Sequence, residues 1–353
     1  MKSLTYYKVD CPKCHGALNS AAPLSGKTIC PFCGMVYHIT ANVTKEDEMP
    51  EEIIPFATSA ADFVQSARKM LVDQEYAPVN MSEHISFEGV KGIYLPAFLY
   101  KGKYECSWSC KVKQSPAGND KAKSRIEDYR PQNGVSKGDY SIVGMACEGV
   151  ESCKELAEYV RSIDVKDADI QPFFPDRLHD RFFLTRNCDS PKTWTQWGED
   201  TMKIVVRNNT LLQLQGDEIK DFKCDITSCT LSEGRFIFLP VWMINYQYDG
   251  EAHHIFMDGT GRNGVRGTTL IDHTLKARAE KPFTMLKYIA VAAIVIPFLM
   301  LLAKLHLPAI IALIIMGLVF FGYRYYARWH KNRIISKARK EREKWLGRTP
   351  RNS

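Results

Sequence analysis

The chain has 353 residues, 45% of them hydrophobic and 25% charged, which fits a globular protein of about two or three domains. Its net charge of +7 is unevenly distributed, because residues 324–353 carry +9 and residues 1–323 carry −2. This distribution argues against a nucleic-acid-binding surface spread over the body of the protein.

The N-terminal region, residues 1–45, contains two C-x2-C pairs separated by fifteen residues. Zn²⁺ prefers four soft ligands in a tetrahedron, and two facing turns of this kind supply them. The pattern therefore predicts a zinc ribbon held by Cys11, Cys14, Cys30 and Cys33, with Gly16 and Gly34 at the sharp turns. A redox dithiol and four packed thiols are the alternatives. Because every ligand position is cysteine, we expect a closed, structural Zn²⁺ site rather than a catalytic one.

We expect no secretory signal in MKSLTYYKVDCPKC, which has no apolar core of sufficient length. Cysteines without such a signal indicate a reducing compartment, where thiols bind metal or pack. The remaining cysteines have irregular spacing. Two of them, in Cys106-x3-Cys110, could be half of a second metal site, but small buried residues are the preferred interpretation. The full set is Cys106, Cys110, Cys147, Cys153, Cys188, Cys224 and Cys229.

Residues 50–150 and 151–280 are expected to form two related α+β units, each a helix packed on antiparallel strands. Tyr94–Phe98 (YLPAF) is weakly similar to Phe238–Trp242 (FLPVW), although chance is an alternative explanation. Periodicity and turn residues predict helices at 59–74, 152–162 and 192–208. We expect strands at 92–104 (two, joined near Lys101-Gly102), 140–145, 211–215, 222–231, 235–248 and 251–257, and a polar loop or ragged hairpin at 111–139.

Two glycine motifs suggest chemistry. DGTGRNGVRG contains Gly259, Gly261 and Gly264 with the G-x-G-x-x-G spacing of a dinucleotide-binding loop. Such a loop needs a helix after it, and VRGTT is a poor helix former, so we expect turns instead. Gly134–Gly138 fits G-x-S-x-G, but a loop precedes it and a strand follows, which excludes a nucleophile elbow.

Neither a phosphate-binding loop nor H-E-x-x-H occurs in the sequence. His253 and His254 are adjacent, and neighbours in a strand point to opposite faces, so we do not expect them to share a metal. Our interpretation is that the protein is not an enzyme, and it rests mostly on these absences.

Residues 283–323 are predicted to form a transmembrane helical hairpin with arms at 283–302 and 307–323, each of about 17–20 residues and near spanning length. A buried hairpin of a soluble domain and a re-entrant hairpin, favoured by Pro297 and Pro308, are the alternatives. Basic residues before the first arm and after the second place both termini in the cytoplasm. The predicted fold class is thus α+β with an N-terminal zinc ribbon, two related units and a C-terminal hairpin.

The basic tail, residues 324–353, is expected to continue the second helix out of the membrane. Cations next to a leaflet bind anionic lipid at roughly 1 kcal/mol each. The alternatives are a simple topology anchor and a docking site for an acidic partner. The residues predicted to bind lipid or partner are Arg324, Arg328, Lys331, Arg333, Lys337, Arg339 and Lys340.

Several stretches together resemble a bacterial family of zinc-ribbon membrane proteins, sometimes labelled TFIIB-type zinc-ribbon or primosomal-helicase-like proteins. They are CPKCHG…CPFCG, EEIIPFATSAADFVQSARKML, GIYLPAFLYKGKY, DIQPFFPDRLHDRFF and FLPVWMINYQYDGEAHHIFMDGTGRNGVRG, which extend over most of the chain. The resemblance implies a membrane partner in envelope-stress modules, beside phage-shock-protein-A-like and flotillin-like proteins.

The resulting hypothesis is a multi-pass protein of the bacterial cytoplasmic membrane that acts as a scaffold, with a structural Zn²⁺ and protein partners. A membrane-tethered nucleic-acid-binding or transcription-regulatory protein is the alternative, because ribbons often bind nucleic acid and residues 1–40 are mildly basic. A hydrolase or cofactor-dependent enzyme ranks last.

Overall fold

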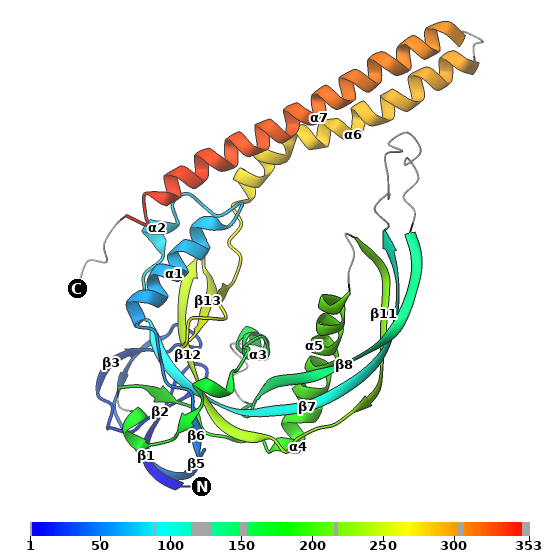
Figure 1. Ribbon diagram of the computed structural model, residues 1–353. Helices are drawn as coiled ribbons and strands as arrows, with labels where there is room; N and C mark the ends of the chain where they lie inside the picture. The colour runs from blue at the N-terminus through cyan, green and yellow to red at the C-terminus, as the bar shows by residue number, and fades with distance from the viewer. Residues whose placement is uncertain are drawn as a thin grey trace. The chain divides into compact units, whose positions relative to one another are not determined.

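The computed structural model describes residues 2–87, 89–113, 129–148, 154–178, 180–214, 218–302 and 306–347. The fold is mixed α+β: N-terminal strands carry the four-cysteine cluster, followed by a large mixed sheet and two long C-terminal helices (Figure 1). The chain divides into two compact units. The first comprises Met1–Phe63, Glu88–Asn245 and His254–Arg266, and the second Val64–Phe87, Tyr246–His253 and Gly267–Ser353.

One mixed sheet, which contains 12 strands within the described residues, makes up most of the first unit. Its main path runs β14-β13-β12-β7-β10-β2-β1-β5, and β3 and β4 form a separate ribbon. The strands are β1 (Lys2–Asp10), β2 (Ala17–Ser20), β3 (Gly26–Ile29), β4 (Val36–Ile39), β5 (Val43–Met49), β6 (Glu52–Ile53), β7 (Lys91–Lys113), β8 (Tyr129–Met145), β9 (Gln171–Pro172), β10 (Phe182–Phe183), β11 (Ile219–Cys229), β12 (Arg235–Tyr248), β13 (Glu251–Asp258) and β14 (Val265–Gly267).

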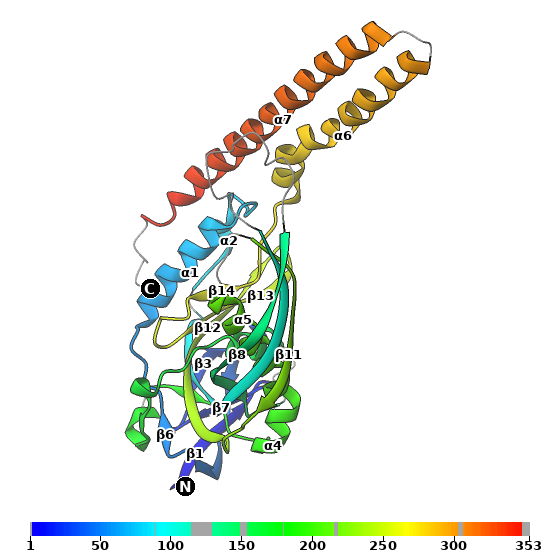
Figure 2. The same cartoon turned by 45° about the vertical axis from the view of Figure 1, so that its right-hand side comes forward.

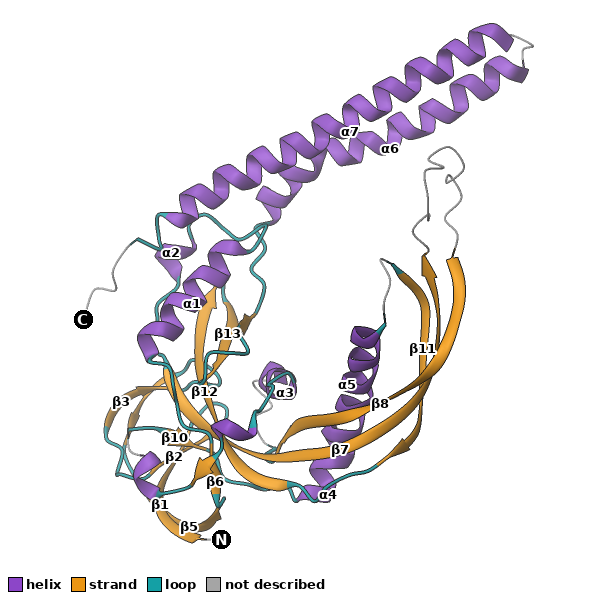
Figure 3. Ribbon diagram, in the orientation of Figure 1, coloured by secondary structure: helices purple, strands orange, loops and turns teal. Residues whose placement is uncertain are grey.

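The helices differ greatly in length, and Figure 3 distinguishes them from the strands. Short 3-10 turns lie at Asp167–Asp169 and Pro175–Leu178, and a π-helical turn at Trp194–Gly198 joins α4 to α5. The α-helices are α1 (Ala60–Asp73), α2 (Met81–His84), α3 (Lys154–Arg161), α4 (Ser190–Thr193), α5 (Glu199–Gln213), α6 (His273–Leu302) and α7 (His306–Glu343).

The main core of the first unit joins α3, the central strands and the cysteine turns. Ile237, Leu239 and Val241 alternate along β12 and pack in one cluster with Leu156 of α3. The same cluster contains Cys11, Cys30 and Phe32, all fully buried. The cysteine region is therefore part of the hydrophobic core of the body and not a separate module beside it.

Strands β7, β8 and β11 form a long curved sheet, and they lie side by side in Figures 1 and 2. The prediction of two strands joined near Lys101-Gly102 is wrong, because β7 continues without interruption through both residues. Gly102 serves close packing instead of a turn, since an added Cβ would lie 1.9 Å from the Thr230 carbonyl and 2.5 Å from the Tyr140 hydroxyl.

Of the two alternatives for residues 111–139, a polar loop and a ragged hairpin, the described residues agree with the hairpin, because β7 extends to Lys113 and pairs antiparallel with β8 from Tyr129 onward. Residues 114–128 lie outside the described part. The strand predicted at 211–215 is wrong where it is described, because α5 continues to Gln213. Packing explains this: Val206 and Thr210 are buried one helical turn apart, and tertiary contacts override strand propensity.

The other expected elements are found close to their predicted positions. Helix α1 matches 59–74, and Ser59 caps it: its hydroxyl accepts from the Asp62 N–H at 3.2 Å, and Asp62 in turn accepts from the Ser59 N–H at 2.8 Å. Strands β12 and β13 match 235–248 and 251–257. The two similar stretches pair with each other, Leu95 opposite Leu239. The division of 50–280 into two related units stays a prediction.

In the second unit, α6 and α7 pack along each other. Both predicted hairpin arms are helical, and α6 continues through Pro297. The prediction that the basic tail extends the second helix is confirmed, since α7 runs without a break to Glu343.

Candidate metal centre

The four cysteines lie on two turns with the same backbone geometry. In the first turn, the Cys11 N–H donates to the Gly16 carbonyl at 3.1 Å and the His15 N–H to the Cys11 carbonyl at 2.9 Å. In the second, the Cys30 N–H donates to Met35 at 2.8 Å and the Gly34 N–H to Cys30 at 2.9 Å. Each turn closes on itself and directs both of its thiols toward the other turn.

The residue that bends each turn follows the second cysteine directly. His15 has φ 56° and Gly34 has φ 70°. The sequence predicted that Gly16 makes the sharp turn after the first pair of cysteines. This prediction is wrong, because the residue with left-handed backbone in that turn is His15. Gly16 is needed for space, because an added Cβ would lie 2.6 Å from the ring of Phe32.

The distances between the sulfur atoms fit a tetrahedral metal site. All four lie within 4.8 Å of one another, with Cys11 to Cys33 at 3.6 Å and Cys14 to Cys30 at 3.7 Å. A Zn–S bond of about 2.3 Å requires an edge of about 3.8 Å between thiolates. A disulfide needs about 2.05 Å, and all four cysteines are free thiols. Because the four sulfur atoms form one cluster and the shortest distances join the two turns, a zinc-ribbon-like site is better supported than a redox dithiol within one C-x2-C pair.

The pKa shifts at the centre reflect the burial and close spacing of its four thiols. Burial raises the pKa of the Cys30 thiol, and the neighbouring charges of Cys14 and Cys33 raise it further. Burial, followed by the charges of Cys30 and the other three cysteines, raises the pKa of Tyr37. Four thiolates this close repel one another in a buried site, and a divalent ion offsets that repulsion. With four protein ligands present, no coordination position is left for water, as in structural zinc sites.

The second turn is attached to the β12–β13 pair by buried hydrogen bonds. The Phe32 carbonyl accepts from Nδ2 of Asn245 at 3.1 Å and from Nε2 of His254 at 2.7 Å. Nδ1 of His254 lies 3.2 Å from the Glu155 carboxylate of α3. Sequence reasoning missed this network, because Phe32 and His254 are 222 residues apart and no local pattern connects them.

No second metal cluster is present among the residues that the structure describes. Cys106 and Cys110 are both buried in β7, and the Cys106 thiol lies 3.1 Å from the Thr210 hydroxyl. Small buried residues therefore remain the better interpretation of these two cysteines; Cys153 lies outside the described residues. The predicted opposite orientation of the two histidines agrees with their contacts, since His253 stacks on Tyr246 at 5.4 Å while His254 faces Phe32.

The two glycine motifs have structural roles. Gly261 and Gly264 adopt φ 76° and 71°, and the Asp258 carboxylate accepts from the Asn263 N–H at 2.8 Å, so this segment is a turn that leads into β14 and not into a helix. Gly134–Gly138 lies within β8, where an elbow between strand and helix cannot form.

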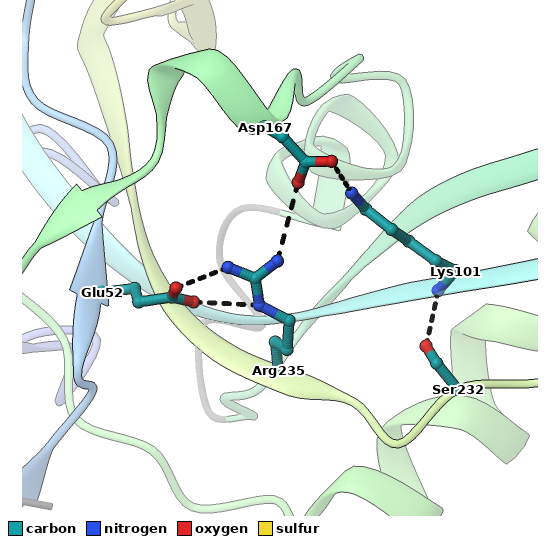
Figure 4. Close-up of polar contacts among 5 residues, drawn as sticks. All are labelled: Glu52, Lys101, Asp167, Ser232 and Arg235. Atoms are coloured by element: carbon teal, nitrogen blue, oxygen red, sulfur yellow. Dashed lines mark hydrogen bonds and ion pairs between the residues drawn. The ribbon is translucent and has the colours of Figure 1, made fainter.

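A second polar cluster joins β6, β7 and β12 (Figure 4). Arg235 binds Glu52 through two hydrogen bonds, of 3.0 and 2.5 Å, and lies 3.6 Å from Asp167, which also pairs with Lys101. A surface cavity of about 730 Å³ lies beside it and includes Lys101, Asp167 and Ser232 in its lining. The charges drawn in Figure 4 compensate one another, so this cluster connects strands and offers no unmatched charge to a ligand.

The predicted basic residues of the tail fall into two groups. Lys331 pairs with Glu75 at 2.7 Å, and Arg339 pairs with Asp73 at 2.6 Å, so these two stabilise the second unit itself. The other five are exposed and make no ion pair within the described residues; they are Arg324, Arg328, Arg333, Lys337 and Lys340. Binding of lipid or partner by the tail stays a prediction.

Sequence reasoning missed Arg342, which is 2% exposed. Its guanidinium donates to the carbonyls of Ala77 at 2.5 Å and Gln74 at 2.9 Å, just after the end of α1. The available signal was its position on the apolar face of the tail helix, since Ala338 and Trp345 lie four residues before it and three after it and are also buried.

Helices α6 and α7 are long and apolar enough to cross a membrane, with apolar windows at mean hydropathy 1.8 in each. Only 11% and 6% of these windows are buried, unlike a core helix of a soluble protein. Among their exposed side chains are Ile294, Phe298, Ile314 and Leu318.

Comparison with protein-family models, curated proteins and solved structures finds no match to this chain. The family resemblance of the sequence therefore stays a prediction. What the molecule itself establishes is a four-cysteine, zinc-ribbon-like centre within an α+β body that also carries two long apolar helices.

Proposed function

We propose that the protein is a membrane-anchored platform at the cytoplasmic face of a bacterial membrane, where its body binds protein partners. The observation that carries the proposal is the pair α6 and α7, whose apolar side chains are exposed along both helices. Exposed apolar surface of this extent is unfavourable in water and favourable in lipid. The helices would form a hairpin that anchors the body.

The orientation follows from charge and cysteine chemistry. Lys276, Arg278 and Lys281 lie before the apolar part of α6, and the basic end of α7 follows its own apolar part. The positive-inside rule keeps such flanks in the cytoplasm. Free thiols that bind Zn²⁺ also require a reducing compartment, so two independent arguments give the same side.

The metal in this proposal is structural. Four cysteine ligands supply Zn²⁺ with a complete coordination shell, and the second turn is built into the core through Phe32. Bound Zn²⁺ would hold the two turns together and stabilise the body that receives partners. The resemblance to zinc-ribbon membrane proteins supports a role in envelope stress, with phage-shock-protein-A-like or flotillin-like partners.

Nucleic-acid binding by the ribbon is less well supported. Lys8, one of the cations in the N-terminal region, already pairs with Asp10 at 3.1 Å. The second cysteine turn packs into the core through Phe32, so it is not a separate module free to bind nucleic acid. A salt-dependent gel shift with the full-length protein would favour this alternative, and no shift at low salt would exclude it.

The test of the platform is affinity purification of the tagged, full-length protein from gently solubilised membranes. A protein partner should be recovered in stoichiometric amount, and it should be absent when the same tag is purified on an unrelated membrane hairpin. Recovery of the chain alone in several mild detergents would contradict the proposal.

A further inference from the structure

The part of α7 that lies in the basic tail, from residue 324 onward, has two faces that differ in their contacts. One face holds the second unit together through Lys331, Arg339 and the buried Arg342. The opposite face carries Trp329, Arg333, Lys337 and Lys340, which we call the outer stripe. Their spacing of four, four and three residues places them in one row along the helix.

The cations of the outer stripe form no ion pair within the described part of the chain, and the charge of Lys337 acts only at longer range on Glu341, which is itself hydrogen-bonded to Lys344. Arg333, Lys337 and Lys340 are exposed, and no described acid forms an ion pair with them. The contact made by Arg333 is with the ring of Trp329, at 5.2 Å. Like charges at this spacing destabilise an isolated helix, so the stripe is not explained by folding of the helix.

The distance of the outer stripe from the membrane indicates whether its cations bind lipid or a protein. The apolar arm ends near Tyr323, and a rise of 1.5 Å per residue places Arg333, Lys337 and Lys340 about 15, 21 and 26 Å beyond it. The headgroup layer is only about 5–7 Å thick, and the Debye length is about 8 Å. Even a tilt of about 40° keeps the two lysines beyond the reach of lipid phosphates.

We propose that the outer stripe is the docking site for an acidic helical segment of a partner protein. Carboxylates one helical turn apart on such a segment match the spacing of Arg333, Lys337 and Lys340, and the exposed Trp329 supplies an aromatic contact at one end. The inference rests on the proposed platform function and identifies its binding surface and the charge of its partner.

The test uses the full-length protein in phosphatidylcholine nanodiscs and a fluorescent 20-residue polyglutamate peptide as the probe. The triple variant Arg333→Gln, Lys337→Gln, Lys340→Gln should bind the peptide at least tenfold more weakly. The control variant Lys45→Gln, Lys166→Gln, Lys223→Gln removes the same charge from exposed positions of the body and should change binding less than twofold. Equal loss in both variants, or none in the stripe variant, would overturn the proposal.

A second arm tests the lipid alternative. The acetylation rates of Lys337 and Lys340, relative to Lys45, are measured by mass spectrometry in neutral discs and in discs with phosphatidylglycerol. The proposal predicts unchanged relative rates, and selective slowing in the anionic discs would assign the stripe to lipid. If the triple stripe variant still co-purifies with a stoichiometric partner, the outer stripe is not the docking site, although the proposed platform function still stands.

Discussion

Gly34→Ala tests whether the second cysteine turn is held by the body. Gly34 has φ 70°, and an added Cβ would lie 2.5 Å from Oδ1 of Asn245, whose amide donates to the Phe32 carbonyl. The left-handed backbone costs about 1 kcal/mol for alanine. Displacing the buried Asn245 adds about 1–2 kcal/mol for the lost hydrogen bond. Together these effects should lower the free energy of unfolding by about 2–3 kcal/mol.

Gly26→Ala is the matched control, because Gly26 has φ 82° but nothing within 4 Å of an added Cβ. The free energy of unfolding of this variant should fall only by the backbone cost of about 1 kcal/mol. Since folding and metal binding are coupled, the difference of about 1.4 kcal/mol should appear as zinc affinity roughly tenfold weaker in the Gly34 variant. Competition with a chromophoric chelator measures this. Equal affinities in the two variants would refute the attachment of the turn to Asn245.

Three further predictions concern the metal, the tail and the glycine turn. Cys30→Ser should lower zinc content well below the one ion per chain expected of the wild type by elemental analysis, and an unchanged content would contradict the four-cysteine site. Arg342→Ala should remove about 3 kcal/mol of stabilisation and speed proteolysis of the tail roughly a hundredfold, whereas Arg339→Ala, which breaks an exposed pair, should have a several-fold effect at most. Alanine at Gly261 and Gly264 together should lower folding yield, with no NAD or FAD binding before or after; glycine-dependent binding of either cofactor would overturn the turn assignment.

The parts of the fold that the sequence predicted are those governed by local chemistry. Paired C-x2-C motifs place the four thiols whatever surrounds them, and alternating apolar residues define β12 and β13. Apolar length likewise predicts α6 and α7. These signals require no knowledge of distant parts of the chain.

The parts that the sequence did not predict depend on distant partners. Gly102 resembles a turn residue, but its lack of a side chain accommodates the Thr230 carbonyl, 128 positions later in the chain. The contact of Phe32 with His254 is also tertiary and has no local signature. The burial of Arg342 depends on the distant carbonyls of Gln74 and Ala77, and its position between the buried Ala338 and Trp345 was the one local signal for it. Sequence reasoning therefore identified the four clustered cysteines but not the groups that attach their turns to the body.

The central claim is that α6 and α7 anchor the chain with both flanks in the cytoplasm. Fusion of green fluorescent protein, and separately of alkaline phosphatase, to the C-terminus tests it, with carbonate extraction of the membranes from the same cells. The account predicts a fluorescent fusion, an inactive phosphatase and a chain that stays in the carbonate-washed membranes. An active phosphatase, or a chain released by carbonate, would contradict it.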